Sequence, residues 1–103
     1  MRSRYTAYKL QIPKYIINTT HNKNIDFKID NKIWEKEILE FCQNCNFDKL
    51  TIKEFIDGKN ESFVTFEVKL ECDNKDNSFI EKSRFIKEFN KWYYIDGIFL
   101  ENL

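Results

Sequence analysis

The apolar residues in the first half of the chain repeat at the spacing of helices. Residues 2–10 predict a short helix, and Pro13 predicts the start of a second one, because the N–H that proline lacks has no partner in a first helical turn. A third helix is predicted from an N-cap at Asp30 to about Cys45. Its apolar stripe consists of Trp34, Ile38, Phe41, Cys42 and Cys45.

The second half of the chain changes to the alternating pattern of strands. Strands are predicted over residues 49–57, 62–72, 79–89 and 92–100. The second strand alternates most clearly, and its core side consists of Val64, Phe66, Val68, Leu70 and Cys72. Helices followed by an antiparallel meander predict an α+β domain, in which three helices cover one face of a four-stranded sheet.

The last two predicted strands allow a register to be counted. If residues 90–91 form a two-residue turn, Asp96 lies opposite Phe85 and Gly97 lies opposite Arg84. Arg84 and Asp96 then lie on opposite faces of the sheet and are not predicted to pair. Gly97 would leave room for the Arg84 side chain to lie across the backbone.

The composition limits the class of protein. The chain has 103 residues, which suit one domain over residues 1–103. Its formal net charge is zero, which argues against a protein held to nucleic acid by bulk electrostatics. No apolar run approaches the ~18–20 residues of a membrane span. Neither a nucleic acid nor a membrane is therefore expected as a partner.

Arginine is rare in this chain and therefore informative. Arg2, Arg4 and Arg84 are the only arginines among 17 basic residues. A guanidinium offers a planar fork of donors and keeps its charge when partly buried, which lysine does not do reliably. The preferred interpretation is structural: an ion pair, or stacking of Arg4 on Tyr8 four residues later. The alternatives are a small anionic ligand in a pocket and a basic surface for a partner.

The three cysteines form an odd set. With no signal peptide at the start of the sequence, they predict free thiols in a reducing cytoplasm. Cys42, Cys45, Cys72 and His21 have the residue types of a zinc site. However, each of the cysteines falls on a predicted apolar face, where free cysteine is common. No metal site and no cofactor are therefore predicted.

Three stretches of the sequence together resemble a known family. They are MRSRYTAY, YIINTTH and SRFIKEFNKWYYIDG, and they resemble the central domain of the YchJ-like bacterial proteins. The resemblance spans nearly the whole chain and implies a nuclear-transport-factor-2-like (cystatin-like) fold, a cone of helices packed on a curved sheet. Relatives carry SEC-C zinc-binding motifs outside this domain, and these flanking motifs are expected to be absent here. The family is of unknown function, so the resemblance implies a fold and little chemistry.

The preferred functional hypothesis is a non-catalytic, cytoplasmic module. It would bind a small ligand, with an anion as one option, or a protein partner through the concave face of the sheet, and it would form a homodimer. The candidate ligand-binding residues are Arg4, Tyr5, Tyr8, Trp34, Arg84 and Tyr94.

The alternative hypothesis is a small-molecule enzyme. Folds related to the one that the resemblance implies include isomerases and dehydratases that work in a conical pocket. Asp96 or His21 would be the base, and aromatic neighbours would raise the pKa of Asp96. Each candidate also has a structural interpretation, since Asp96-Gly97 is an ordinary strand-end turn and His21 could interact with the last carbonyls of a helix.

Overall fold

The computed structural model describes residues 1–100, in which three helices precede a sheet. The helices are α1 (Arg2–Lys9), α2 (Pro13–Asn18) and α3 (Asn31–Asn44). The strands are β1 (Cys45–Ile56), β2 (Glu61–Cys72), β3 (Lys75–Asp76), β4 (Phe79–Glu88) and β5 (Lys91–Leu100). The predicted α+β class and order of elements are confirmed. The short strand β3, which pairs with the end of β2, was not predicted.

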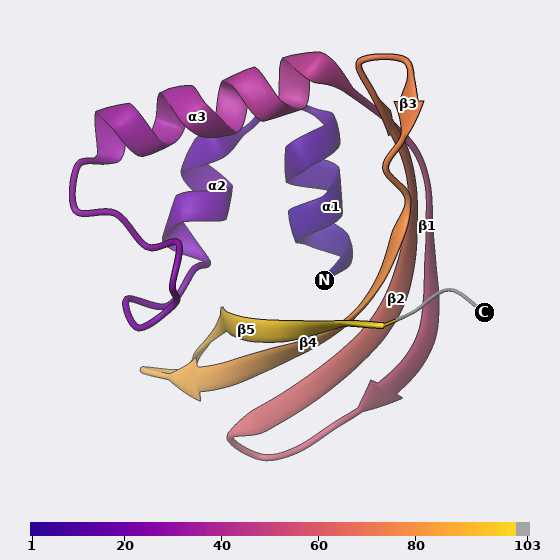
Figure 1. The fold of residues 1–103 in the computed structure, drawn as a ribbon. Coiled ribbons are helices and arrows are strands. Elements are labelled where there is room, and N and C mark those ends of the chain that lie inside the picture. The colour runs from indigo at the N-terminus through magenta and orange to yellow at the C-terminus, as the bar shows by residue number, and fades with distance from the viewer. Residues whose placement is uncertain (101–103) are drawn as a thin grey trace.

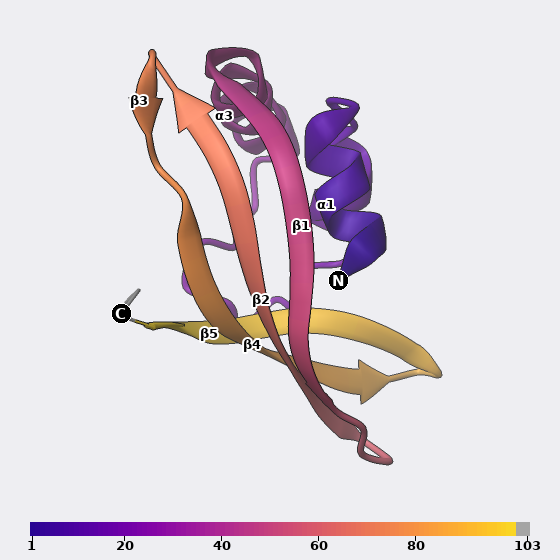
Figure 2. The same cartoon turned by 90° about the vertical axis from the view of Figure 1, so that its right-hand side faces the viewer.

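The sheet is antiparallel and strongly curved. Its strand order is β1-β2-β4-β5, with β3 beside β2. Register shifts interrupt the β1–β2 pairing at two places, after Phe47 and after Ile52, and such bulges bend the strands that contain them. The sheet therefore curls around α1, as Figure 1 shows, and β5 runs nearly crosswise to β1 in Figure 2. All three helices lie on the concave side (Figure 1).

Helices α2 and α3 begin where the sequence predicts. The carboxylate of Asp30 accepts hydrogen bonds from the backbone N–H groups of Lys32 and Ile33, which confirms the predicted N-cap of α3. Pro13 occupies the first turn of α2, as predicted.

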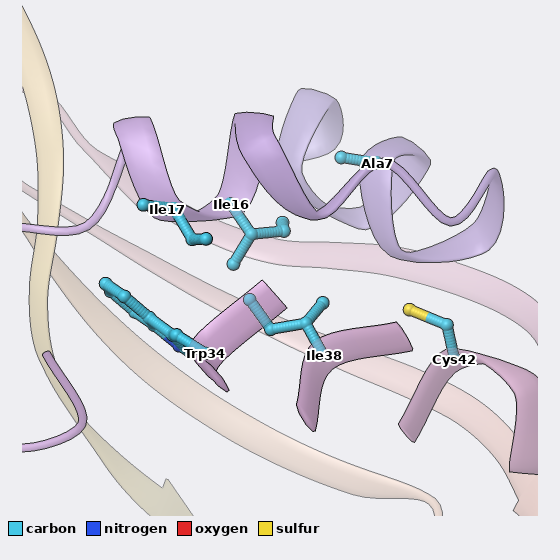
Figure 3. Close-up of a cluster of buried hydrophobic side chains, with 6 residues drawn as sticks. All are labelled: Ala7, Ile16, Ile17, Trp34, Ile38 and Cys42. Atoms are coloured by element: carbon cyan, nitrogen blue, oxygen red, sulfur yellow. The ribbon is translucent and has the colours of Figure 1, made fainter. Parts of the chain in front are cut away.

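The core consists of two apolar clusters. The first joins the three helices, and Figure 3 shows its side chains from α1 and α2 facing those of α3: Ala7, Ile16, Ile17, Trp34, Ile38 and Cys42. The second lies on the sheet and comprises Cys45, Val64, Phe66, Val68, Leu70 and Phe85. Phe41 was predicted to be buried in the apolar stripe of α3, but it is 44% exposed. Its ring packs edge-on against Tyr8 and Phe47.

The register predicted for the last hairpin is wrong. The two turn residues are Phe89 and Asn90, with φ angles of 53° and 62°, and not residues 90–91. Ile95 is an extra residue in β5, because the pairing shifts by one position there. As a result Arg84 lies opposite Asp96 and on the same face.

The prediction of free thiols is wrong for two of the three cysteines. Cys45 opens β1 and lies directly opposite Cys72 at the end of β2. The two form a disulfide across a sequence separation of 27 residues, with 4.1 Å between their Cα atoms. Cys42 remains a free, buried thiol. Burial raises the pKa of that thiol.

Candidate functional site

A cavity of about 800 Å3 lies between the helices and the concave face of the sheet. Side chains from α1, α3 and all four long strands line it. Its apolar wall includes Tyr5, Tyr8, Trp34, Ile38, Phe41, Phe47, Phe66, Val68, Leu70, Phe79 and Phe99. The polar groups in the lining include Arg4, Glu81, Ser83 and Tyr94.

Arg4 is a buried cation that joins α1 to the end of α2. Its side chain is 7% exposed. Nη1 donates to the carbonyl oxygen of Ile16 at 3.2 Å, to Thr19 Oγ1 at 2.7 Å and to Thr20 Oγ1 at 3.2 Å. These acceptors lie in and just after the last turn of α2, where helix carbonyls lack partners. Arginine therefore has a structural role here, in agreement with the preferred interpretation.

The aromatic partner of Arg4 is Tyr94 and not Tyr8. The guanidinium carbon lies 4.9 Å from the centroid of the Tyr94 ring, a cation–π distance. Within residues 1–100 no carboxylate oxygen lies within 4.0 Å of the guanidinium. Burial accordingly lowers the pKa of Arg4 from its usual value. The site thus contains a desolvated positive charge held by neutral groups.

Glu81 is a buried carboxylate on the inward face of β4. It is 8% exposed, and Oε2 accepts hydrogen bonds from Ser83 Oγ at 2.6 Å and from the Tyr94 hydroxyl at 2.9 Å. Gly97 of β5 lies beside this carboxylate and makes room for it. Burial of a carboxylate is tolerated where hydrogen bonds compensate for the lost water.

The tyrosine hydroxyls of the cavity remain protonated at neutral pH. Burial and the neighbouring Glu81 carboxylate raise the pKa of Tyr94 far above its usual value. Burial also raises the pKa of Tyr8, although Arg4 opposes that shift. Burial raises the pKa of Tyr5 as well, and its buried hydroxyl has no hydrogen-bond partner among the residues described. The cavity therefore offers phenolic donors.

The structure brings five of the predicted site residues together in the lining of this cavity. They are Arg4, Tyr5, Tyr8, Trp34 and Tyr94. Glu81 and Ser83 were missed by the sequence analysis. The alternation that assigns Phe79 and Phe85 to the inward face also assigns Glu81 and Ser83 to it. A charged residue at an inward position of a strand was the sequence signal that could have identified Glu81 as a candidate site residue.

Arg84 and Asp96 lie outside the cavity lining and bind each other. Arg84 Nε donates to Asp96 Oδ1 at 2.9 Å, and Nη2 donates to Asp96 Oδ2 at 2.7 Å. Arg84 Nη1 also contacts Glu61 at 3.2 Å. The hydrogen bond from Arg84 lowers the pKa of Asp96, so the expected raised pKa is wrong. Asp96 has the environment of a surface ion pair and not that of a buried base.

His21 also lies outside the lining, in the loop that follows α2. Its Nδ1 accepts from the backbone N–H of Lys23 at 3.0 Å, and its Nε2 lies 3.0 Å from Glu88 Oε2. Its backbone N–H donates to the carbonyl of Tyr94 at 2.8 Å. Among the described residues neither ring nitrogen contacts a carbonyl of α2, so the predicted interaction of His21 with the last carbonyls of that helix is wrong. The imidazole instead fixes the loop against the β4–β5 hairpin.

Comparison with known proteins places this architecture in a family. The model of the YchJ middle NTF2-like domain matches residues 1–97. The chain belongs to the YchJ-like family. It is 36% identical to a UPF0225 protein of Pectobacterium carotovorum subsp. carotovorum over 98% of this chain and 65% of that protein. It is 34% identical to a UPF0225 protein of Vibrio vulnificus over 98% of this chain and 58% of that protein. The chain thus spans about three fifths of the length of these YchJ-like relatives.

Solved structures support the same fold. A SEC-C motif containing protein from Rhodopseudomonas palustris superposes with a TM-score of 0.80 at 23% identity, over 98% of this chain and 76% of that one. A second SEC-C motif containing protein, from Psychrobacter arcticus, superposes with a TM-score of 0.71 at 21% identity, over 100% of this chain and 60% of that one. At these identities the YchJ-like chain shares a fold with them, and function is a separate question.

Two further observations concern the described part of this YchJ-like domain. None of its helices is long and apolar enough to cross a membrane. No group of three or more His, Cys, Asp or Glu side chains in residues 1–100 is arranged to hold a metal ion.

Proposed function

We propose that this domain is a non-catalytic module that binds a small, largely apolar molecule in the cavity between its helices and sheet. The observation that carries the proposal is the cavity itself. Its volume of about 800 Å3 lies in the range of small-molecule sites, and it combines an apolar wall with a few buried polar groups.

The positions of the candidate bases favour binding over catalysis. Asp96 and His21 both lie outside the cavity lining. Asp96 contacts Arg84, and His21 contacts Glu88. A general base must reach the proton that it removes from a bound substrate. The isomerase or dehydratase hypothesis with either residue as base therefore lacks support.

A cavity-filling variant tests the proposal. The probe is N-phenyl-1-naphthylamine, an uncharged dye whose fluorescence rises in apolar surroundings. Val68→Phe adds a ring to the cavity wall, and Thr65→Phe adds the same ring on the opposite face of β2. We expect saturable binding at one site per domain, weakened at least about tenfold by Val68→Phe and unchanged by Thr65→Phe. Absence of saturable binding, or equal binding by both variants, would contradict the proposal.

The predicted homodimer is a second part of the proposal. The edge strand β5 presents exposed apolar side chains near its end, with Ile98 66% and Phe99 70% exposed. An edge strand with exposed apolar residues favours pairing with another chain. Light scattering during gel filtration should give twice the monomer mass of 12.6 kDa, and Ile98→Lys should halve that value. A monomeric wild-type protein would contradict this part.

A further inference from the structure

The polar end of the cavity contains two buried charges of opposite sign that do not contact each other. Arg4 and Glu81 both line the cavity and are each more than nine-tenths buried. The distance between their charged atoms exceeds the 4.0 Å limit of an ion pair. The inference drawn from this arrangement rests on the proposed function and specifies the class of ligand.

Each of the two charges has hydrogen-bonding capacity that the described protein groups do not use. The three hydrogen bonds of the Arg4 guanidinium all come from Nη1, so Nε and Nη2 donate to no acceptor within residues 1–100. A guanidinium carries five N–H donors. Glu81 accepts both of its side-chain hydrogen bonds through Oε2. Its other oxygen, Oε1, accepts no hydrogen bond from residues 1–100.

Tyr94 sets the spacing between the two charges. Its ring lies under the Arg4 guanidinium, and its hydroxyl donates to Glu81. The guanidinium thus lies over the face of the phenol ring, the carboxylate lies at its hydroxyl, and the two charges remain separate. Burying an unpaired charge is costly, and a partner of opposite charge offsets that cost. A ligand that supplies a partner to each charge would bind better than one that supplies a single charge.

We propose that the ligand is a small zwitterion with an apolar body, of the kind represented by an α-amino acid with an aromatic side chain. Its carboxylate would accept from Nε and Nη2 of Arg4, and its ammonium group would donate to Oε1 of Glu81. The body would lie against the aromatic wall of Phe47, Phe66 and Phe79. A simple anion would be repelled by Glu81, and a simple cation would be repelled by Arg4.

Three compounds with one phenyl body separate these cases. L-phenylalanine carries both charges, 3-phenylpropionate carries only the carboxylate, and 2-phenylethylamine carries only the ammonium group. In titration calorimetry with the full chain, we expect L-phenylalanine to bind at least about tenfold more tightly than either of the others, because each charge-assisted hydrogen bond adds that much.

A charge-neutralising variant identifies the residue responsible. Glu81→Gln keeps the shape of the side chain and removes its charge. It should weaken L-phenylalanine binding about tenfold and strengthen 3-phenylpropionate binding, which reverses the selectivity. This reversal cannot arise from a loss of folding, which would weaken both ligands. The matched control is Glu67→Gln on the outward face of β2, which should change neither affinity.

Two results would overturn the proposal. One is equal affinity of the wild-type protein for L-phenylalanine and 3-phenylpropionate, or for L-phenylalanine and 2-phenylethylamine. The other is a parallel loss of all three affinities in Glu81→Gln. The titration with the uncharged naphthylamine dye separates this failure from that of the proposed function. If the dye binds and Val68→Phe prevents it, a cavity for apolar ligands stands and only the zwitterionic class is wrong.

Discussion

Gly97 on β5 leaves the space that the carboxylate of Glu81 occupies on β4. A Cβ atom at position 97 would lie 2.1 Å from Oε2 of Glu81 and 2.8 Å from its carboxyl carbon, which is closer than real atoms approach. The backbone of Gly97 does not have a positive φ. The position therefore requires glycine because there is no room for a side chain, and not because of its conformational freedom. Since Ser83 and Tyr94 hold the carboxylate, it cannot move aside without loss of hydrogen bonds.

The first prediction follows from this close approach. Gly97→Ala should lower the free energy of unfolding by about 1–3 kcal/mol, the usual cost of overpacking. In a Glu81→Ala background the same substitution should cost much less, because the carboxylate is gone. Urea unfolding of the four proteins measures the coupling between the two positions. An equal cost of Gly97→Ala in both backgrounds would show that another contact is responsible.

The second prediction compares two arginines that lie two residues apart. Arg4→Lys should destabilise the domain by about 1–3 kcal/mol, because a lysine side chain ends one bond short of Nη1 and lacks the planar group that lies over the ring of Tyr94. Arg2 is exposed, so Arg2→Lys should change stability by less than about 0.5 kcal/mol. Thermal unfolding of the two variants tests the difference. Equal melting temperatures would contradict a structural role that is specific to Arg4.

The helices of this domain could be predicted from the sequence because their signals are local. The N-cap at Asp30 and the stripe along α3 depend only on neighbouring residues. The predicted hairpin register was wrong because the register depends on a Phe with positive φ at the turn and on a bulge at Ile95. The residue types at these positions predict neither feature. The Cys45–Cys72 disulfide was not predicted because Cys45 was assigned to the helix, whereas it opens β1 and pairs with the end of β2. The cavity residues were found only where an aromatic or basic residue was already conspicuous.

The third prediction concerns the pH dependence that Asp96 adds. Arg84 lowers the pKa of Asp96 in the folded protein, so the folded state favours the ionised carboxylate. The ion pair therefore stabilises the fold above the unfolded pKa of about 4, and this contribution disappears as the pH falls through the lower folded value. Unfolding of wild type and Asp96→Asn should differ by a constant amount between pH 5 and pH 7 and converge in stronger acid.

A control for this pH effect is available in the same chain. Asp57 is exposed in the connection between β1 and β2, and no ion pair involves it within residues 1–100. Asp57→Asn should therefore leave the pH dependence of unfolding unchanged. If Asp96→Asn and wild type stay equally far apart below pH 3, the Arg84 contact is not the origin of the difference.

The fourth prediction concerns the disulfide between Cys45 and Cys72. A cross-link that closes a loop of about this length stabilises a fold by roughly 3–4 kcal/mol in the chain-entropy account. Reduction with a phosphine should therefore lower the urea midpoint of wild type and of Cys42→Ala, but not that of the Cys45→Ala/Cys72→Ala double variant. Without reductant, the denatured wild-type chain should react with one equivalent of thiol reagent, at Cys42. Three reactive thiols per chain would show that the cross-link does not form, and the stability of the α3–β1 junction would then depend on packing alone.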